Sequence, residues 1–159
     1  ATMRILGIDP GTSLIGYGII DFDGKKYIMV DCGDFKTPSN TKNRERVATV
    51  YNFFNKLIAK HKPDKISLES LFIFKNSKTV IQVSELRGVI MLAAVNSGVA
   101  IDEFTPLQVK QAVSGYGRAE KDQVQRMVSL ILGQKNIPGP DDVADALALA
   151  ICCANTIVY

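Results

Sequence analysis

A chain of 159 residues, with 47% apolar and 22% charged residues, is long enough for one hydrophobic core and has the composition of a globular domain. No signal peptide or membrane-length apolar run stands out, so we expect no membrane partner, and the net charge of +3 is too small to indicate a nucleic-acid partner by itself. The three cysteines, Cys32, Cys152 and Cys153, form no C-x-x-C pair and predict buried thiols in the reducing cytoplasm.

A single domain is predicted, because no internal repeat, low-complexity segment or linker interrupts the sequence. We expect this domain to cover residues 3–157. Ala1 and Thr2 precede Met3 and are expected to be additions before the natural start.

Three β-rich segments form the N-terminal part of the chain: Met3–Asp9, Ile15–Asp21 and Lys26–Gly33. The turns between them contain Pro10-Gly11 and Asp23-Gly24. Strands joined by short Gly-containing turns pair with their neighbours in sequence, so this part predicts an antiparallel meander.

Helices and strands alternate in the remainder of the chain. Apolar residues from Val47 to Ile58 recur at steps of three and four, which predicts an amphipathic helix that Pro63 ends. The order of elements predicts an α/β fold, a mixed five-stranded sheet with helices on both faces. The predicted elements are the helix Asn43–Lys62, the strand Lys65–Glu69, the helix Lys78–Val95, the strand Ala100–Phe104 and the helices Pro106–Ser114, Glu120–Leu132 and Asp141–Ala154.

The second half of the predicted helix Lys78–Val95 reads GVIMLAAV and is apolar on nearly every side. A helix of this kind is buried from two directions. One side is expected to face the sheet of its own chain and the other a second chain.

Carboxylates follow two of the predicted strands, with Asp9 at the end of the first and Glu69 at the end of the fourth. If these strands are parallel neighbours, both side chains lie at one edge of the sheet, where open α/β sheets bind ligands. Asp142 and Asp145 are three residues apart and therefore share a face of the last helix. Four carboxylates at one point repel each other unless a cation holds them, and hard oxygen ligands favour Mg²⁺ or Mn²⁺.

Structural roles compete with this interpretation for some of these residues. Asp9 is also suited to capping the turn that follows it. Asp141 is interpreted mainly as a cap of the last helix, and capping remains an alternative for Asp142. His61, the single histidine, follows a lysine at a helix end and is expected to be an exposed partner of the helix dipole rather than a catalyst.

Four stretches of the chain resemble, in order, the motifs of the RuvC family of Holliday junction resolvases: GIDPGTSLIGYGII, SLESLFIFKN, TPLQVKQAVSGYGRAEKDQVQRMV and DDVADALALA. The resemblance extends from Met3 to Ala154. It implies a ribonuclease H-like fold, a homodimer, and divalent-metal-dependent nicking of four-way DNA junctions in recombination and repair. It also implies work alongside a branch-migration helicase complex.

The resemblance places the acidic tetrad of the family on Asp9, Glu69, Asp142 and Asp145. The spacing of three residues selects Asp142 over Asp141 as the partner of Asp145. With two metal ions held among these carboxylates, one ion would activate a water for in-line attack on the phosphodiester and the other would stabilise the leaving 3′ oxygen.

Two further segments are candidates for DNA contacts. Aromatic side chains among lysines suit stacking on unpaired bases while the cations meet phosphates, and a hydrophobic staple before the helix is the alternative, mainly for Phe74. The resemblance implies that Phe72 contacts bases at the junction centre. It also favours a functional role for Lys110 and Lys121 over that of solvated surface lysines. Either would then stabilise charge at the scissile phosphate. The candidates are Phe72, Phe74, Lys75 and Lys78 in the first segment, and Lys110, Arg118 and Lys121 around the GYG turn in the second.

Three other functions remain open from the residues alone. The D-x-G-T pattern after the first strand also occurs in phosphate-binding modules of the actin and sugar-kinase type, which need two such domains. A junction-binding protein without catalysis is a second alternative. A ribonuclease H-like nuclease that acts on RNA is the third.

Overall fold

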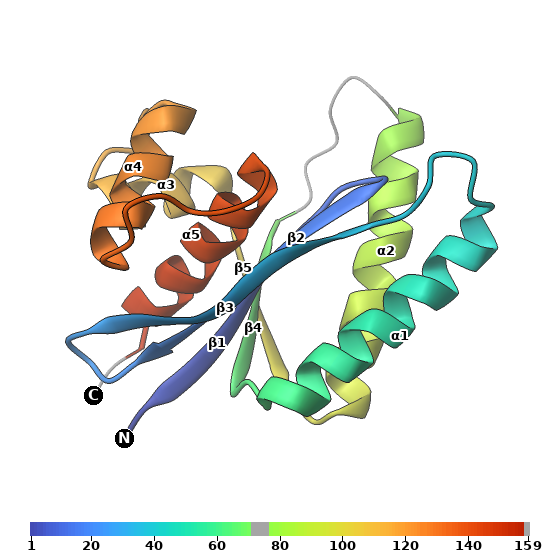
Figure 1. Cartoon of the computed structure of the whole chain (residues 1–159), viewed down its shortest axis with the longest axis horizontal. Helices are drawn as coiled ribbons and strands as arrows, with labels where there is room; N and C mark the ends of the chain where they lie inside the picture. Colours follow the sequence, from blue (N-terminus) through green and yellow to red (C-terminus); the bar gives the residue numbers. More distant parts are fainter. Residues whose placement is uncertain (71–76, 158–159) are drawn as a thin grey trace.

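The computed structural model describes residues 1–70 and 77–157 and has a five-stranded sheet with the strand order β3-β2-β1-β4-β5 (Figure 1). β1 pairs antiparallel with β2, and β2 with β3, whereas β4 is parallel to β1 and to β5. The predicted meander and mixed sheet are therefore confirmed. The strands are β1 (Met3–Pro10), β2 (Leu14–Phe22), β3 (Tyr27–Lys36), β4 (Lys65–Glu69) and β5 (Ala100–Phe104).

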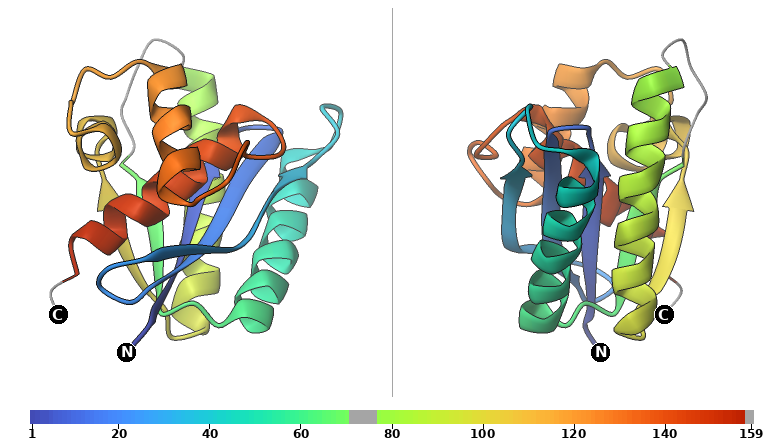
Figure 2. Two further views of the ribbon diagram at one scale, coloured as in Figure 1. Left: turned by 60° about the vertical axis from the view of Figure 1, so that its left-hand side comes forward. Right: turned by 90° about the vertical axis from the view of Figure 1, so that its right-hand side faces the viewer.

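Helices cover both faces of the sheet, as the two side views show (Figure 2). One face carries α5, with α3 and α4 packed beside it, and the other carries α1 and α2. Each face has its own cluster of buried apolar side chains, so the sheet is apolar on both sides. The helices are α1 (Asn43–His61), α2 (Ser77–Asn96), α3 (Pro106–Ser114), α4 (Lys121–Ile131) and α5 (Asp141–Asn155).

The close approach of α5 to the sheet depends on glycines in β1 and β2. A Cβ atom placed on Gly7 would lie 1.9 Å from the carbonyl oxygen of Ala146, and one on Gly16 would lie 2.2 Å from that of Asp142. Real Cβ atoms never come so near a carbonyl oxygen. The backbone of α5 therefore rests directly on these two strands, and its first turn is fixed over the end of the sheet.

Some element ends differ from the predicted ones. β3 continues three residues beyond Gly33 to Lys36, because its polar end pairs with the start of β2, where Leu14 is opposite Lys36. The predicted first residue of the fourth helix, Glu120, is the N-cap of α4, which begins at Lys121. Pairing between strands and cap geometry decide these boundaries, and neither is visible in the hydrophobic pattern.

α2 requires a correction to the expectation that no apolar run reaches membrane-spanning length. Within the described residues, the segment Lys78–Asn96 is long and apolar enough to span a membrane by length and composition. In the structure one face of this helix, with Leu86, Ile90 and Ala94, is buried against α1 and the sheet. Only 28% of the segment is buried, so packing inside the chain accounts for part of its hydropathy and the other face is exposed.

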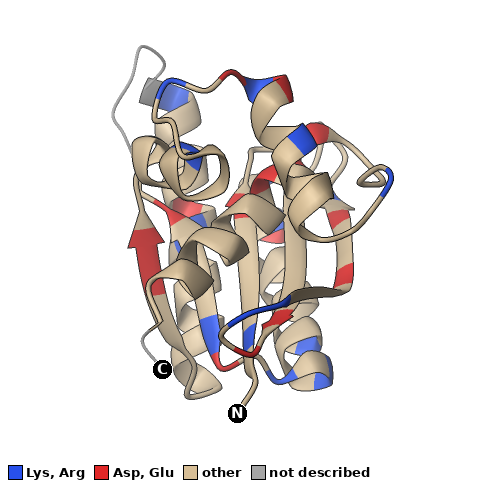
Figure 3. Cartoon of the chain, turned by 90° about the vertical axis from the view of Figure 1, so that its left-hand side faces the viewer, with Lys and Arg blue, Asp and Glu red and all other residues tan. Residues whose placement is uncertain are grey.

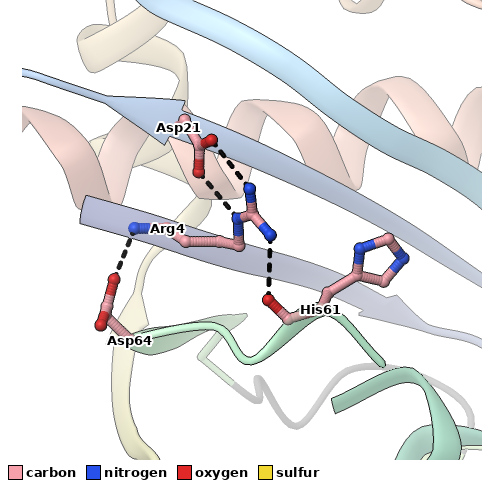
Figure 4. A network of polar contacts seen from close by, with 4 residues as sticks. All are labelled: Arg4, Asp21, His61 and Asp64. Carbon is pink, nitrogen blue, oxygen red and sulfur yellow. Dashed lines mark hydrogen bonds and ion pairs between the residues drawn. The ribbon is translucent and has the colours of Figure 1, made fainter. Parts of the chain in front are cut away.

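A polar cluster joins the opposite end of the sheet to the end of α1 (Figure 4). Arg4 binds both carboxylate oxygens of Asp21, at 2.8 and 2.9 Å, and donates to the carbonyl of His61 at 3.1 Å. The side chain of His61 is only 11% exposed, and its Nε2 lies 3.0 Å from the carboxylate of Asp31. The expectation of an exposed histidine is therefore wrong, because the chain after β3 brings α1 back along the strand that carries Asp31.

Candidate active site

The predicted carboxylates come from three elements that meet at one end of the sheet. Asp9 is the second-to-last residue of β1 and lies opposite Gly16 of β2. Glu69 is the last residue of the parallel neighbour β4. Because α5 rests on Gly16 through the backbone of Asp142, its first turns bring Asp142 and Asp145 to the same end.

The carboxylates are close enough to raise each other's pKa values. Burial raises the pKa of Asp9 to about 8, and the charges of Asp145, Asp142 and Glu69 add to the rise. The pKa of Glu69 is raised by burial and by the charge of Asp145. The pKa of Asp145 is raised by burial, against the opposing effect of Lys121. The ionised form of each of these half-buried carboxyl groups is destabilised by the charges of the others. A bound cation would stabilise the ionised forms.

Basic side chains from α3, α4 and the loop between them lie around the carboxylates. Lys121 lies 3.4 Å from a carboxylate oxygen of Asp141 and 3.9 Å from one of Asp145. Burial alone would lower the pKa of Lys121, but the charges of Asp145 and Asp141 outweigh it and raise the pKa. The positive charge of Lys110 opposes the rise in the pKa of Glu69. Figure 3 shows acidic positions at the end of the sheet below lysine and arginine positions of the surrounding helices.

Glu69 and Asp145 line a pocket of about 550 Å³ together with residues of α3, α4 and the loop between them, whereas Asp9 and Asp142 are not part of its lining. Its lining carries both charges: the acidic residues are Glu69, Glu120 and Asp145, and the basic ones are Lys110, Arg118 and Lys121. Val109, Val124 and Leu149 give it an apolar floor. A pocket that carries both carboxylates and lysines suits a phosphodiester whose charge is shared between metal ions and lysines.

The donor set of the site fits a hard divalent cation, because it consists of carboxylates alone. In the part of the chain that the structure describes, no three Asp, Glu, His or Cys side chains are arranged to enclose one ion. Mg²⁺ sites in phosphoryl-transfer enzymes commonly use one or two carboxylates together with waters and substrate phosphates.

Asp141 does not have its predicted role. The N-cap of α5 is Pro140, and no side chain caps the helix there. Asp141 is the first residue of α5, is exposed, and pairs with Lys121. A proline at the cap position leaves the acidic side chains of the first turn free to face the site.

Of the predicted DNA contacts in the segment after Glu69, the structure describes only Lys78. Lys78 is exposed near the start of α2 and does not line the pocket. Phe72, Phe74 and Lys75 lie outside the described residues, so their contacts stay predictions.

Arg87 is a residue near the site that the sequence reasoning missed. It lies in the middle of α2, is 8% exposed, and donates a hydrogen bond to the carbonyl oxygen of Glu69. An arginine within the apolar face of a predicted core helix was the available signal, because a buried guanidinium requires a partner.

The chain matches one known protein family over nearly its whole length. The family model described as crossover junction endodeoxyribonuclease RuvC matches residues 5–153. The RuvC protein of Ruminiclostridium cellulolyticum is 53% identical over 154 residues, which are 97% of this chain and 93% of that protein. The RuvC protein of Fusobacterium nucleatum is 50% identical over 155 residues, 98% of this chain and 82% of that protein. The solved structure of Thermus thermophilus RuvC in complex with a Holliday junction has a TM-score of 0.86 and 30% identity, and the match covers 94% of this chain and 92% of that one.

Proposed function

The chain belongs to the RuvC family of crossover junction endodeoxyribonucleases and resolves four-way DNA junctions, and we propose that Asp9, Glu69, Asp142 and Asp145 hold two divalent metal ions for this reaction. The sheet order and the helices on both faces are those of the ribonuclease H-like fold that the resemblance implied. The ions are expected to be Mg²⁺ or Mn²⁺.

One observation carries the metal proposal: Asp9 is buried among three other carboxylates and has a pKa of about 8. In a metal-free protein this carboxyl group is therefore protonated over much of the neutral range. A carboxylate with a purely structural role would gain no stability from such an environment. Two bound divalent ions would lower the pKa of an attacking water and stabilise the leaving 3′ oxygen. Asp9 and Asp145 would then be ionised, as ligands at the centre of the site.

The cationic wall is proposed to hold the substrate. Lys110 and Lys121 face the carboxylates from α3 and α4, so a phosphodiester bound in the pocket would lie between them and the metal ligands. Their charges would stabilise the phosphorane-like transition state more than the ground state. Arg118, in the exposed loop between these helices, is proposed to contact the phosphate backbone.

Bases at the junction centre are proposed to be contacted by the segment that follows Glu69. Its aromatic and basic side chains, Phe72, Phe74 and Lys75, are followed by Lys78 at the start of α2. Aromatic stacking on an unpaired base contributes about 1–3 kcal/mol. A segment adjacent to a metal ligand would couple recognition of the open junction to cleavage.

A homodimer is the proposed assembly. α2 buries one face in the core and exposes large apolar side chains on the other, where Ile81, Leu92 and Val95 are 59%, 52% and 70% exposed. Exposed apolar side chains along one helix are typical of an interface. A twofold dimer would carry two sites, which matches the two equivalent strands that must be cut in a four-way junction.

The cellular setting is a proposal as well. The three cysteines are free, and Cys152 and Cys153 are buried, which supports a reducing compartment, the cytoplasm. We propose a partnership with a branch-migration helicase complex on the family resemblance, and no membrane partner.

A panel of substrates tests the function. Four-way DNA junctions, linear duplexes, single strands and RNA–DNA hybrids of the same sequence are incubated with the protein in Mg²⁺ and in EDTA. We expect paired, symmetric nicks in the junction with Mg²⁺ alone. Preferential cutting of the hybrid would instead support the RNA nuclease alternative, and metal-dependent binding without any nicking would support a junction-binding protein.

A further inference from the structure

Arg87 is a buried cation on the helix behind the active site. Its side chain is 10% exposed, although an unpaired guanidinium is costly to bury. Nη1 donates to the backbone carbonyl of Glu69, and Nη2 lies 2.7 Å from the carboxylate of Glu103 on β5. One side chain of α2 therefore holds the ends of two neighbouring strands.

These contacts lie at the end of β4, where Glu69 is no longer paired with β1 and has a strand neighbour only in β5. The parallel pairing of β4 with β1 runs from Lys65 to Leu68, one residue short of Glu69. On the other side Glu69 is opposite Phe104, and the N–H of Ser70 donates to the carbonyl of Phe104 at 2.8 Å. Arg87 adds a hydrogen bond from a helix to the last carbonyl of the strand. The backbone from which the Glu69 side chain extends is thus fixed by β5 and α2 together.

We propose that Arg87 is a positioning residue for the nuclease reaction: it clamps the end of β4 to β5 and thereby holds the carboxylate of Glu69 at the metal site. This inference rests on the proposed role of Glu69 as a metal ligand. Arg87 is on the helix whose outer face is the proposed dimer surface. The clamp therefore connects that helix directly to the catalytic end of the sheet.

A second buried arginine, Arg46, has only structural contacts and serves as a control for Arg87. Arg46 of α1 is 6% exposed and binds the hydroxyl of Thr37 at 3.0 Å and the carbonyl of Pro38 at 3.3 Å. Its partners belong to the connection between β3 and α1, and none of them is a candidate catalytic residue. Loss of Arg46 should lower stability alone, whereas loss of Arg87 should change the reaction itself.

Neighbouring carboxylates of β5 provide a matched pair for the test. Glu103 and Asp102 are similarly exposed, at 43% and 37% of the side chain, and each pairs with one cation, Arg87 at 2.7 Å and Lys65 at 2.9 Å. Glu103→Gln removes the charge partner of Arg87 and keeps an amide oxygen in its place, and thermal unfolding measures what this costs the fold. Asp102→Asn removes an ion pair with the more exposed Lys65, which does not reach Glu69, and changes the acceptor of Cys153 as well.

The experiment measures single-turnover cleavage of a saturating four-way junction across a Mg²⁺ titration, with junction binding in Ca²⁺ and thermal unfolding as controls. For Arg87→Lys, which keeps the charge and loses the two-armed clamp, we expect a maximal rate lower by about 10- to 100-fold and a higher Mg²⁺ requirement, with junction binding unchanged. Glu103→Gln should also lower the maximal rate and raise the Mg²⁺ requirement, by less than Arg87→Lys does. Asp102→Asn and Arg46→Gln should leave them as in the wild type.

Two results would overturn the inference: an Arg87→Lys protein with the wild-type rate and Mg²⁺ requirement, or equal behaviour of Glu103→Gln and Asp102→Asn. Should Arg87→Lys fail to fold, the comparison of the two β5 variants decides alone. Failure of the proposed function is distinct, because the wild-type protein itself would then not cut the junction in Mg²⁺.

Discussion

Asp9 is the residue on which the proposed metal site depends most. Its strand is central in the sheet, so its side chain is buried by α5, and three further carboxylates face it. Folding without metal therefore favours the protonated acid, which cannot serve as a ligand. The same burial that makes Asp9 unfavourable in isolation strengthens its interaction with a bound cation, because the local dielectric constant is low.

Stability of the metal-free protein should fall as the pH rises from about 4 to about 8. The pKa of Asp9 is raised from 3.8 in the unfolded chain to about 8 in the fold. Its contribution is therefore fully present below the lower value and lost as the pH rises through the upper one. Glu69 and Asp145, whose pKa values are also raised, act in the same direction. Thermal unfolding in EDTA at several pH values measures the effect.

Asp9→Asn should flatten this pH dependence and raise the unfolding temperature at alkaline pH, while Asp102→Asn should preserve the wild-type slope. Addition of Mg²⁺ should stabilise the wild type more at alkaline than at acidic pH, because the ion binds the deprotonated site. An identical slope in Asp9→Asn and wild type would show that Asp9 is not the buried acid described above.

Two adjacent residues of α5 should behave in opposite ways. Asp142→Asn should abolish cleavage, since Asp142 lies over Gly16 and raises the pKa of Asp9. Asp141→Asn should change activity little, because the Lys121–Asp141 pair is about 60% exposed on each side and such surface pairs contribute about 0–1 kcal/mol. Cleavage rates of the two purified variants measure the difference. Reversed results would show that Asp141, and not Asp142, is the metal ligand in the first turn of α5.

At the scale of elements, the active site is assembled by the packing of α5 on the meander. Gly7 and Gly16 let the helix backbone touch the strands, and the first turn of α5 then comes over Asp9. Because of this contact and the parallel pairing of β1 with β4, the carboxylates of three separate elements lie at one end of the sheet.

Gly16→Ala should displace the start of α5. The added methyl group would lie 2.2 Å from a backbone carbonyl oxygen, which a side-chain rotation cannot relieve. We expect the free energy of unfolding to fall by about 3 kcal/mol or more, and the remaining folded protein to need more Mg²⁺ for cleavage. Denaturant unfolding and a Mg²⁺ titration measure the two effects.

Gly33→Ala on the neighbouring strand is the matched control. Its methyl group would meet the hydroxyl of Tyr17 at 2.7 Å, at the end of a side chain that is able to move. We expect a much smaller loss of stability and an unchanged Mg²⁺ requirement. Equal effects of the two substitutions would argue against a special contact between α5 and Gly16.

The antiparallel meander, the mixed sheet and the strand ends that carry Asp9 and Glu69 could be predicted from the sequence, because turn residues, periodicity and strand ends are local signals, whereas the parallel pairing of β1 with β4 entered only as a condition. Contacts between distant elements could not. Nothing local to Gly16 identifies Asp142 as its neighbour, and nothing local to His61 identifies Asp31. Arg87 was missed for the same reason, since its partners lie on strands that precede and follow its helix.

At the scale of the whole molecule, one helix serves both the core and the proposed interface. α2 buries Leu86 and Ile90 inward and exposes Leu92 and Val95 outward. Two copies joined through this face would place their active sites in a fixed relation, as the symmetric cutting of a junction requires.

Leu92→Glu should convert the proposed dimer into monomers. Leu92 is 52% exposed in the single chain, so a charge there should be tolerated by the fold and rejected by an apolar interface. Light scattering after gel filtration measures the mass. Leu130→Glu on α4, where the side chain is 72% exposed, is the control that should stay dimeric. A wild-type monomer with full junction cleavage would contradict the dimer.

Single-turnover cleavage of a four-way junction by Glu69→Gln and Asp145→Asn shows whether the half-buried carboxylates hold the metal ions of a junction nuclease. Junction binding is measured in parallel in Ca²⁺, so that loss of chemistry is separated from loss of affinity. We predict that both variants bind the junction as the wild type does and do not cut it in Mg²⁺. Cleavage by either variant at close to the wild-type rate would contradict this role of the carboxylates.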